Sequence, residues 1–326
     1  MGRLAFCDCK VNTFFTHSQI FPPESSFLSF FQNFHSPKSP PHSLRLQSPF
    51  LHSTHILQPY HKTATKTTPP QIQSSLQIPY LCTMFEPLDC IALRTVRYND
   101  SKSILSVYTL QHGRVAAMLP AGASREARRL RAVCQPLQRF MCIADIRPNR
   151  DIHRIKDIKP HPLTSPATHS PVKSALALFI ADFLSAILRE PQQDPHLFNF
   201  IAYTVETLAS TPAVKASNFH IAFLFRLQHF LGIEPDWATF SPGAVFDLTD
   251  GIFRQSPPLH NRFLPSSEAE AAHRLSRITF RTATLFTMSR ADRNRVIDRL
   301  IQYYSIHFPG LGAVSSLDVL RSLFSF

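Results

Sequence analysis

Glycine is scarce in this chain, which has only 8 Gly among its 326 residues. Loops that cradle phosphate groups and turns that expose a nucleophile need glycine where the backbone approaches a ligand closely. The spacings HExxH, GxSxG, GxxxxGK(S/T) and GxGxxG are also absent, so no common catalytic or nucleotide-binding motif is present. We therefore expect a protein that is not an enzyme. A metal-free hydrolase, whose acids and histidines would converge in a pocket, is kept as a rival interpretation.

The six cysteines lack any regular spacing. They lie at positions 7, 9, 82, 90, 134 and 142, without a CxxC pair or a histidine pair at zinc-ligand distance. This pattern predicts reduced thiols, no metal site and no disulfide framework. Cys90 and Cys142 fall in expected strands, where we interpret them as small buried apolar side chains.

Long apolar runs are also missing. The nearest, Ala175 to Leu188, is interrupted by Asp182 and is shorter than the roughly 20 residues of a membrane-spanning helix. We expect a buried helix of a soluble domain at this position.

Residues 1–83 contain only two acids, Asp8 and Glu24, and are rich in Ser, Pro, Thr, His and Phe. Runs such as HSPKSPPHS suit neither a strand nor a helix, so we predict a disordered extension. The composition resembles that of an organelle transit peptide, but an Arg-rich amphipathic helix is missing. A translated upstream segment or a disordered tail is the preferred interpretation, with Met84 as the true start.

Residues 84–162 show the pattern of a small β-barrel. Short β-rich runs are expected at 90–96, 104–110, 114–119, 136–146 and 151–158, with turns at 111–113 and 148–150. Five short strands in this length favour an OB-fold, the commonest small barrel with a nucleic-acid-binding face.

Residues 163–326 show helical periodicity instead. Helices are expected near 172–188, 198–208, 219–231, 267–288, 289–307 and 316–324, with a looser stretch from 233 to 265. Ser267 and Ser289 each precede an acid by three residues, which predicts a helix N-cap at each. The predicted fold class is therefore α+β, with an N-terminal OB-fold barrel followed by an α-helical domain and preceded by the disordered extension.

Positive charge is concentrated in the barrel. Residues 84–160 carry 14 Lys and Arg against 7 Asp and Glu, whereas residues 161–326 carry 14 against 13. A localised excess of this kind is typical of a surface that binds phosphates, so nucleic acid is the leading partner.

Four arginines lie between Gly122 and Pro136, in a segment that we interpret as a loop. The candidate DNA-binding residues are these four and their neighbours on the barrel: Arg125, Arg128, Arg129, Arg131, Arg94, Arg97, Lys102 and Arg114. Guanidinium groups bind phosphate in a bidentate manner without reading sequence. Tyr98 is the one candidate for stacking on a base. The alternative is an ordinary solvated loop.

The helical half offers one candidate site for a protein partner. Arg226 lies among Phe and Leu, where it must find an acidic partner or reach the surface. We expect it to bind the carboxylate of a partner peptide, with Lys173 and Arg189 as less certain contributors. The alternative is an internal pair with Asp182 or Glu206. His220 and His229 are interpreted as core or boundary histidines.

Several short motifs follow one another in a fixed order. The barrel motifs are Arg94-x-x-x-Tyr98-x-Asp100-Ser101, Thr109-x-x-His112-Gly113-Arg114, Gly122-x-x-Arg125 and Gln135-Pro136-Leu137. The helical motifs are Phe219 to Pro235, Tyr303-Tyr304, His307 and Ser316-Leu317 with Leu320. With these motifs the chain from residue 84 to 326 resembles the bacterial recombination mediator family RecO.

The resemblance implies binding of single- and double-stranded DNA, annealing of complementary strands and a cytoplasmic, nucleoid-associated location. It also implies contact with the acidic tail of the single-strand-binding protein SSB and, with RecR, help in loading RecA onto coated strands. Many RecO proteins carry a four-cysteine zinc module after the Leu-Gly exit of a helix, but residues 233–265 contain no cysteine. We expect this segment to be held by Trp237, Phe240, Phe246 and Phe253. A general single-stranded RNA- or DNA-binding protein without mediator activity is the rival, and it would have more aromatic residues on the barrel.

Overall fold

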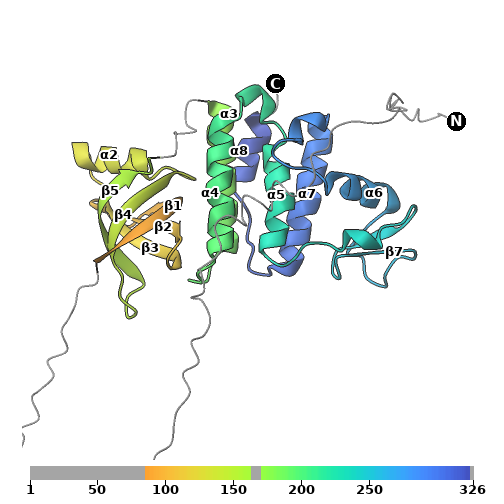
Figure 1. The fold of residues 1–326 in the computed structure, drawn as a ribbon, viewed down its shortest axis with the longest axis horizontal. Helices are drawn as coiled ribbons and strands as arrows, with labels where there is room; N and C mark the ends of the chain where they lie inside the picture. The colour runs from red at the N-terminus through yellow and green to blue at the C-terminus, as the bar shows by residue number, and fades with distance from the viewer. Residues whose placement is uncertain (1–84, 163–169, 324–326) are drawn as a thin grey trace, which may run out of the picture. The chain divides into compact units, whose positions relative to one another are not determined.

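The computed structural model describes residues 85–162 and 170–323 (Figure 1). The predicted extension over residues 1–83 and the predicted start at Met84 lie outside the described residues. None of the described helices is both long and apolar enough to cross a membrane.

The first part of the described chain is a closed five-stranded barrel (Figure 1). Its strands are β1 (Phe85–Arg97), β2 (Lys102–Thr109), β3 (Gly113–Pro120), β4 (Arg139–Asp145) and β5 (Ile152–Pro160). They close in the order β1-β2-β3-β5-β4, with β3 and β5 parallel and the other described pairs antiparallel. This arrangement confirms the predicted OB-fold barrel.

The barrel interior is filled by the alternate residues of its strands. Leu105, Val107 and Phe140 are almost fully buried, and so are the two strand cysteines, Cys90 and Cys142. Their Sγ atoms lie 3.6 Å apart as free thiols, and burial raises the pKa of Cys90. The interpretation of both as buried apolar side chains is confirmed.

The arginine-rich segment after β3 is a helix, so the predicted loop is wrong. Helix α2 (Arg125–Val133) begins after Ser124, whose side chain accepts a hydrogen bond from the Ala127 backbone N–H. Ala127 and Leu130, three residues apart, are its two buried side chains. An N-cap and a narrow apolar stripe are enough for two turns of helix on a barrel.

The strand predicted from residue 136 begins only at Arg139. Leu137 has a φ of 62°, in the left-handed region, so the chain bends there before it enters the sheet.

Six helices make up most of the second part. They are α3 (Pro171–Ile187), α4 (Pro195–Ser210), α5 (Phe219–Phe230), α6 (Ser266–Leu275), α7 (Arg290–His307) and α8 (Ser316–Leu323). Short 3-10 turns cover Ala213–Lys215, Trp237–Thr239 and Ala283–Leu285. The core is aromatic, with Phe179, Phe183, Phe198 and Phe223 almost completely buried. The predicted helical domain is confirmed.

The helix predicted over 267–288 is wrong in length and in its cap. Helix α6 ends at Leu275, and Thr279 and Thr282 then exchange side-chain hydrogen bonds that form a turn. The N-cap position is Pro265 rather than Ser267. The predicted cap at Ser289 is confirmed, because its hydroxyl accepts a hydrogen bond from the Asp292 N–H at 3.1 Å.

Residues 233–265 contain a small sheet that the sequence did not indicate. Its strands β6 (Val245–Asp247), β7 (Ile252–Arg254) and β8 (Phe263–Leu264) pair in the order β7-β6-β8. The expected aromatic packing is confirmed, because the Trp237, Phe246 and Phe253 rings contact one another and Phe240 packs edge-on against Phe253.

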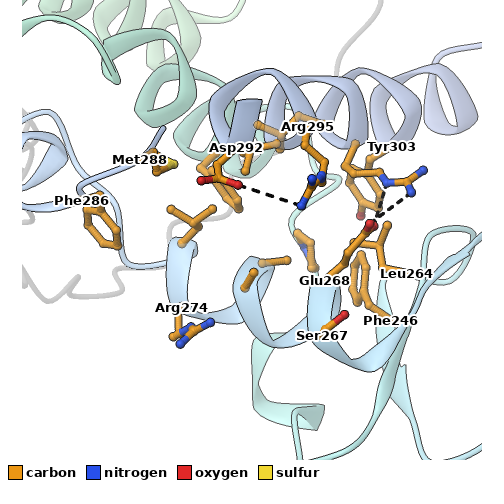
Figure 2. Close-up of a pocket in the computed structure, with 18 of the residues that line it drawn as sticks. Phe246, Leu264, Ser267, Glu268, Arg274, Phe286, Met288, Asp292, Arg295 and Tyr303 are labelled. Carbon is orange, nitrogen blue, oxygen red and sulfur yellow. Dashed lines mark hydrogen bonds and ion pairs between the residues drawn. The ribbon is translucent and has the colours of Figure 1, made fainter. Parts of the chain in front are cut away.

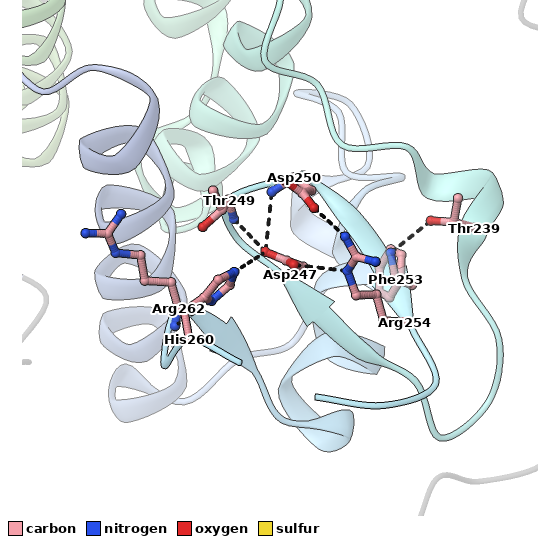
Figure 3. Close-up of polar contacts among 8 residues, drawn as sticks. All are labelled: Thr239, Asp247, Thr249, Asp250, Phe253, Arg254, His260 and Arg262. Atoms are coloured by element: carbon pink, nitrogen blue, oxygen red, sulfur yellow. Dashed lines mark hydrogen bonds and ion pairs between the residues drawn. The ribbon is translucent and has the colours of Figure 1, made fainter. Parts of the chain in front are cut away.

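A buried carboxylate fixes the turn between β6 and β7 (Figure 3). Asp247, with a 1% exposed side chain, accepts hydrogen bonds from the Thr249 and Asp250 N–H groups and from Arg254, and His260 lies 3.5 Å away. Burial raises the pKa of Asp247, but the hydrogen bonds and the charge of His260 outweigh it and leave the pKa below its ordinary value.

Candidate nucleic-acid interface

Three of the expected residues, Arg97, Tyr98 and Lys102, lie in the β1–β2 loop or at the strand ends beside it. Asn99 Oδ1 accepts hydrogen bonds from the Ser101 and Lys102 N–H groups and so closes a tight turn. The turn leaves Tyr98 63% exposed. Arg97 pairs with Asp100 at 2.8 Å, and both side chains are largely in solvent. An exposed pair of this kind releases its arginine to a phosphate at little cost.

Lys102 faces a depression on the barrel surface. The hollow, of about 440 Å³, is lined by Ser101, Lys102, Met118, Leu119, Pro120, Arg154 and Ile155. It lies where the β3–β5 pairing ends, at the partners Met118 and Arg154. A lysine and an arginine from different strands therefore border one hollow, with apolar side chains between them.

The four arginines of α2 are of two kinds, those whose side chains have partners in the described chain and those whose side chains have none. Arg129 is held by Glu126 at 2.7 Å, and Arg131 donates to the carbonyls of Ala121 and Gly122. Arg125 and Arg128 are exposed, and their side chains make no hydrogen bond or ion pair within the described residues. Exposed Arg94, on β1, has no such partner there either.

Arg114 joins the barrel to the helical domain. Its guanidinium donates to the carbonyls of Ser185, at 2.9 Å, and Leu188, at 2.7 Å. These carbonyls belong to the C-terminal end of α3, where a cation is favoured. Burial lowers the pKa of Arg114, and the charges of Arg189 and Arg94 lower it further.

The basic residues of the β4–β5 hairpin are not among those that the sequence predicted to bind DNA. They are Arg147 and Arg150 in the loop and Arg154, Lys156 and Lys159 on β5. Arg147 and Arg150 flank Asp145 at 2.9 and 3.8 Å. The β1–β2 and β4–β5 loops and the β2–β3 face are the binding surface of OB-folds. The turn at 148–150, already visible in the sequence, is the signal that leads to these residues.

Arg139 is a second residue that links the barrel to the helical domain, and it is not an exposed cation. It binds Asp89 of β1 at 2.7 Å and Glu206 of α4 at 3.0 Å, and its side chain is only 14% exposed. Around it, Ile91, Leu93 and Tyr108 of the barrel belong to the same apolar core as α3 and α4.

The residues expected to bind a protein partner do not form one cluster. Lys173 donates to the Ala209 carbonyl and Arg189 to that of Gly310. These two residues lie 16 positions apart, which is about 24 Å along a helix. Arg226 is half-buried on α5.

The acids considered as internal partners of Arg226 have other hydrogen-bond partners. Asp182 accepts from Ser316, and Glu206 binds Arg139. His220 is a core residue, as interpreted, and burial lowers its pKa to about 3. His229 is exposed and lies 2.7 Å from Glu234. Within residues 85–162 and 170–323, no three His, Cys, Asp or Glu residues form a group that could hold a metal ion.

Together these features define an OB-fold barrel with an exposed basic surface, fixed to a helical domain. Two family models match the same two parts of the chain. Recombination protein O N terminal matches residues 84–162, and Recombination protein O C terminal matches residues 168–315. The chain belongs to the RecO family of DNA repair proteins.

Curated relatives agree with the family models. DNA repair protein RecO of Phocaeicola vulgatus is 36% identical over 235 residues, which cover 72% of this chain and 97% of that protein. DNA repair protein RecO of Porphyromonas gingivalis is 36% identical over 239 residues, with the same coverage. That of Bacteroides fragilis is 34% identical over 235 residues, again 72% of this chain and 97% of the relative.

Proposed function

We propose that this protein is a non-enzymatic mediator of recombinational repair that binds single- and double-stranded DNA on the barrel and anneals complementary strands. With RecR it assists the loading of RecA onto DNA coated by SSB, in the cytoplasm and at the nucleoid. The observation that carries the proposal is a set of exposed cations on the barrel of a RecO-family chain, whose side chains make no hydrogen bond or ion pair within residues 85–162 and 170–323. They are Arg94, Lys102, Arg125, Arg128 and Arg154.

Phosphate contacts account for the affinity in this proposal. Arginine and lysine side chains neutralise the backbone and release its counterions without reading the base sequence. Among the aromatic side chains of the described barrel, Tyr98 and Phe85 are the strongly exposed ones, and Lys156 covers the Phe85 ring at 3.9 Å. Tyr98 is therefore the residue that we propose to stack on a base, and a single stacking contact suits binding that tolerates any sequence.

Arg226 is the proposed contact for a protein partner. A half-buried arginine on an aromatic helix fits the carboxylate of a peptide that ends in an apolar residue, as the acidic tail of SSB does. Lys173 and Arg189 are retained as contributors only through their positions at the two ends of α3. RecR and RecA are proposed partners without an assigned surface.

The DNA site is tested by removing the unpaired cations. In the variant Arg94→Gln/Lys102→Gln/Arg125→Gln/Arg128→Gln, the log–log salt slope of single-strand binding should fall by ~3, at about 0.7 for each lost phosphate contact. Fluorescence anisotropy with an oligothymidylate at several salt concentrations measures this slope.

The matched control is Arg129→Gln/Arg131→Gln, whose side chains already have partners in the chain. It should lower the slope by less for each charge removed. An unchanged slope in the fourfold variant would place the DNA site elsewhere. Equal affinity for RNA, with no strand annealing, would favour a general single-strand-binding protein.

A further inference from the structure

The helical domain contains a local cluster of arginines, although its acidic and basic residues are nearly equal in number overall. Residues 274–299 contain seven Arg and two acids. The arginines are Arg274, Arg277, Arg281, Arg290, Arg293, Arg295 and Arg299. This segment joins the end of α6 to the first half of α7, so the charges come from a short stretch of chain.

Three of these arginines are free to bind an anion. Arg274, Arg277 and Arg281 are exposed, and their side chains make no hydrogen bond or ion pair within the part of the chain that the structure describes. Arg295 faces Asp292 at 4.0 Å on the surface, which is a weak pair. Arg299 is different, because Glu268 holds it at 2.8 Å.

Arg274, Arg295 and Arg299 border a cavity of about 460 Å³ between α6 and α7 (Figure 2). Helix α7 runs along one side of it and α6 along the other, and Arg274 and Arg295 belong to opposite sides. Flat rings make up much of its wall, and they come from Phe225, Trp237, Phe246, Phe286 and Tyr303. A pocket of this size and lining takes a flat, mostly apolar group.

A buried amide gives the cavity a polar group as well. Gln228 lines it and is only 2% exposed, yet its Oε1 has no hydrogen-bond partner within the described residues. An unpaired buried amide costs stability that a ligand can recover by hydrogen bonding to it. The ring that fits this cavity is therefore one whose edge carries hydrogen-bonding groups.

We propose that this cavity and the arginines Arg274, Arg277, Arg281 and Arg295 form a second site for single-stranded DNA. An unstacked base enters the cavity between the aromatic side chains and meets the Gln228 amide, while the arginines bind the flanking phosphates. The inference rests on the proposed function in one respect, because annealing needs a place for a second strand beside the one on the barrel.

An acidic peptide is the other anionic ligand with an apolar group. Its apolar side chain would fill the cavity but offer no hydrogen bond to Gln228 Oε1, whereas a base carries donors and acceptors on the same ring that enters the cavity. Arg277 and Arg281 also continue the charge beyond the residues that line the cavity, as a strand that runs out of the pocket requires. The nucleic acid is thus the ligand that more of the observations fit.

Photocrosslinking of the full chain tests the proposal. An oligothymidylate that carries 5-iododeoxyuridine is irradiated with the protein, and the crosslinked peptides are mapped by mass spectrometry. We expect crosslinks at Trp237 or Tyr303 in addition to the barrel. The variant Arg274→Gln/Arg277→Gln should lose the cavity crosslink severalfold and slow strand annealing, while Lys215→Gln/Arg262→Gln, which removes two exposed charges that do not line the cavity, should leave both unchanged.

A second variant tests the entry of the base without changing charge. Ala271→Trp places a ring in the cavity and should abolish the crosslink there while the affinity of the barrel is retained. Crosslinks confined to the barrel would overturn the proposal, as would a cavity that a Phe-ended acidic peptide occupies and the oligonucleotide does not. If the wild-type protein did not bind DNA at all, that result would instead contradict the proposed function itself.

Discussion

At the scale of single residues, the buried carboxylate of Asp247 is the feature with the clearest effect on the stability of the fold. Asp247 is completely enclosed, yet it stays ionised because two backbone N–H groups and Arg254 bond to it. Its carboxylate accepts hydrogen bonds from several residues of the β6–β7 turn and so holds them together, as a bound cation does in other proteins.

The pH dependence of stability follows from that carboxylate. The pKa of Asp247 is lowered in the folded protein, so its ionised form stabilises the fold above the ordinary Asp value of about 3.9, and the effect is lost as the pH falls from there through the lowered pKa. Asp247→Asn should lower the free energy of unfolding by about 1–3 kcal/mol at neutral pH and by progressively less in acid. Urea unfolding at a series of pH values measures the difference.

The exposed neighbour Asp250 provides the comparison. Asp250→Asn removes a surface partner of Arg254 and should change the unfolding free energy little at any pH. A deficit in Asp247→Asn that stayed constant from neutral pH to acid would show that the carboxylate is not the source of the stabilisation.

At the scale of secondary-structure elements, α2 shows how a short helix presents cations. Ser124 caps it through the Ala127 N–H at 3.1 Å, and the arginines on its exposed face depend on the helix for their spacing. Ser124→Ala should cost about 1 kcal/mol of helix stability, speed hydrogen exchange of the α2 amides and weaken DNA binding modestly. Ser124→Asn keeps an uncharged side chain that can cap the helix and should do none of these. Equal exchange in the two variants would show that the cap is unimportant.

The sequence predicted the long elements well, but it did not reveal short elements or contacts between residues far apart in the chain. The barrel strands and α3, α4 and α5 have an apolar period over many residues, so the sequence indicates them well. Helix α2 was missed because Ala127 and Leu130 are its only buried residues, and β6 to β8 are too short for any period. The role of Arg114 depends on carbonyls 71 and 74 residues away, which no local pattern reveals.

At the scale of the whole molecule, Arg114 and Arg139 both link the barrel to the helical domain. Arg139 links β4 to Asp89 and Glu206, and the apolar core continues across from β1 to α3. Arg139→Met should lower the free energy of unfolding by about 3 kcal/mol, because it leaves the nearly buried Asp89 without its main partner. Chemical unfolding, followed separately by Trp237 fluorescence in the helical domain and by hydrogen exchange in the barrel, would show the loss.

Arg129→Met is the matched change, because it breaks an exposed pair with Glu126 within one helix. It should leave stability nearly unchanged. If Arg139→Met unfolded with the same midpoint as the wild type in both probes, the ion pairs would not be what holds the two domains together.

The segment from residue 233 to 265 is held by stacked rings and one carboxylate, and it contains no thiol. A metal-binding cysteine cluster in that place would be open to peroxide, which oxidises the thiolates and so releases the metal that they hold. In this protein the part of the molecule next to the α6–α7 cavity has no thiol for peroxide to oxidise, so we expect its shape to be insensitive to that oxidant.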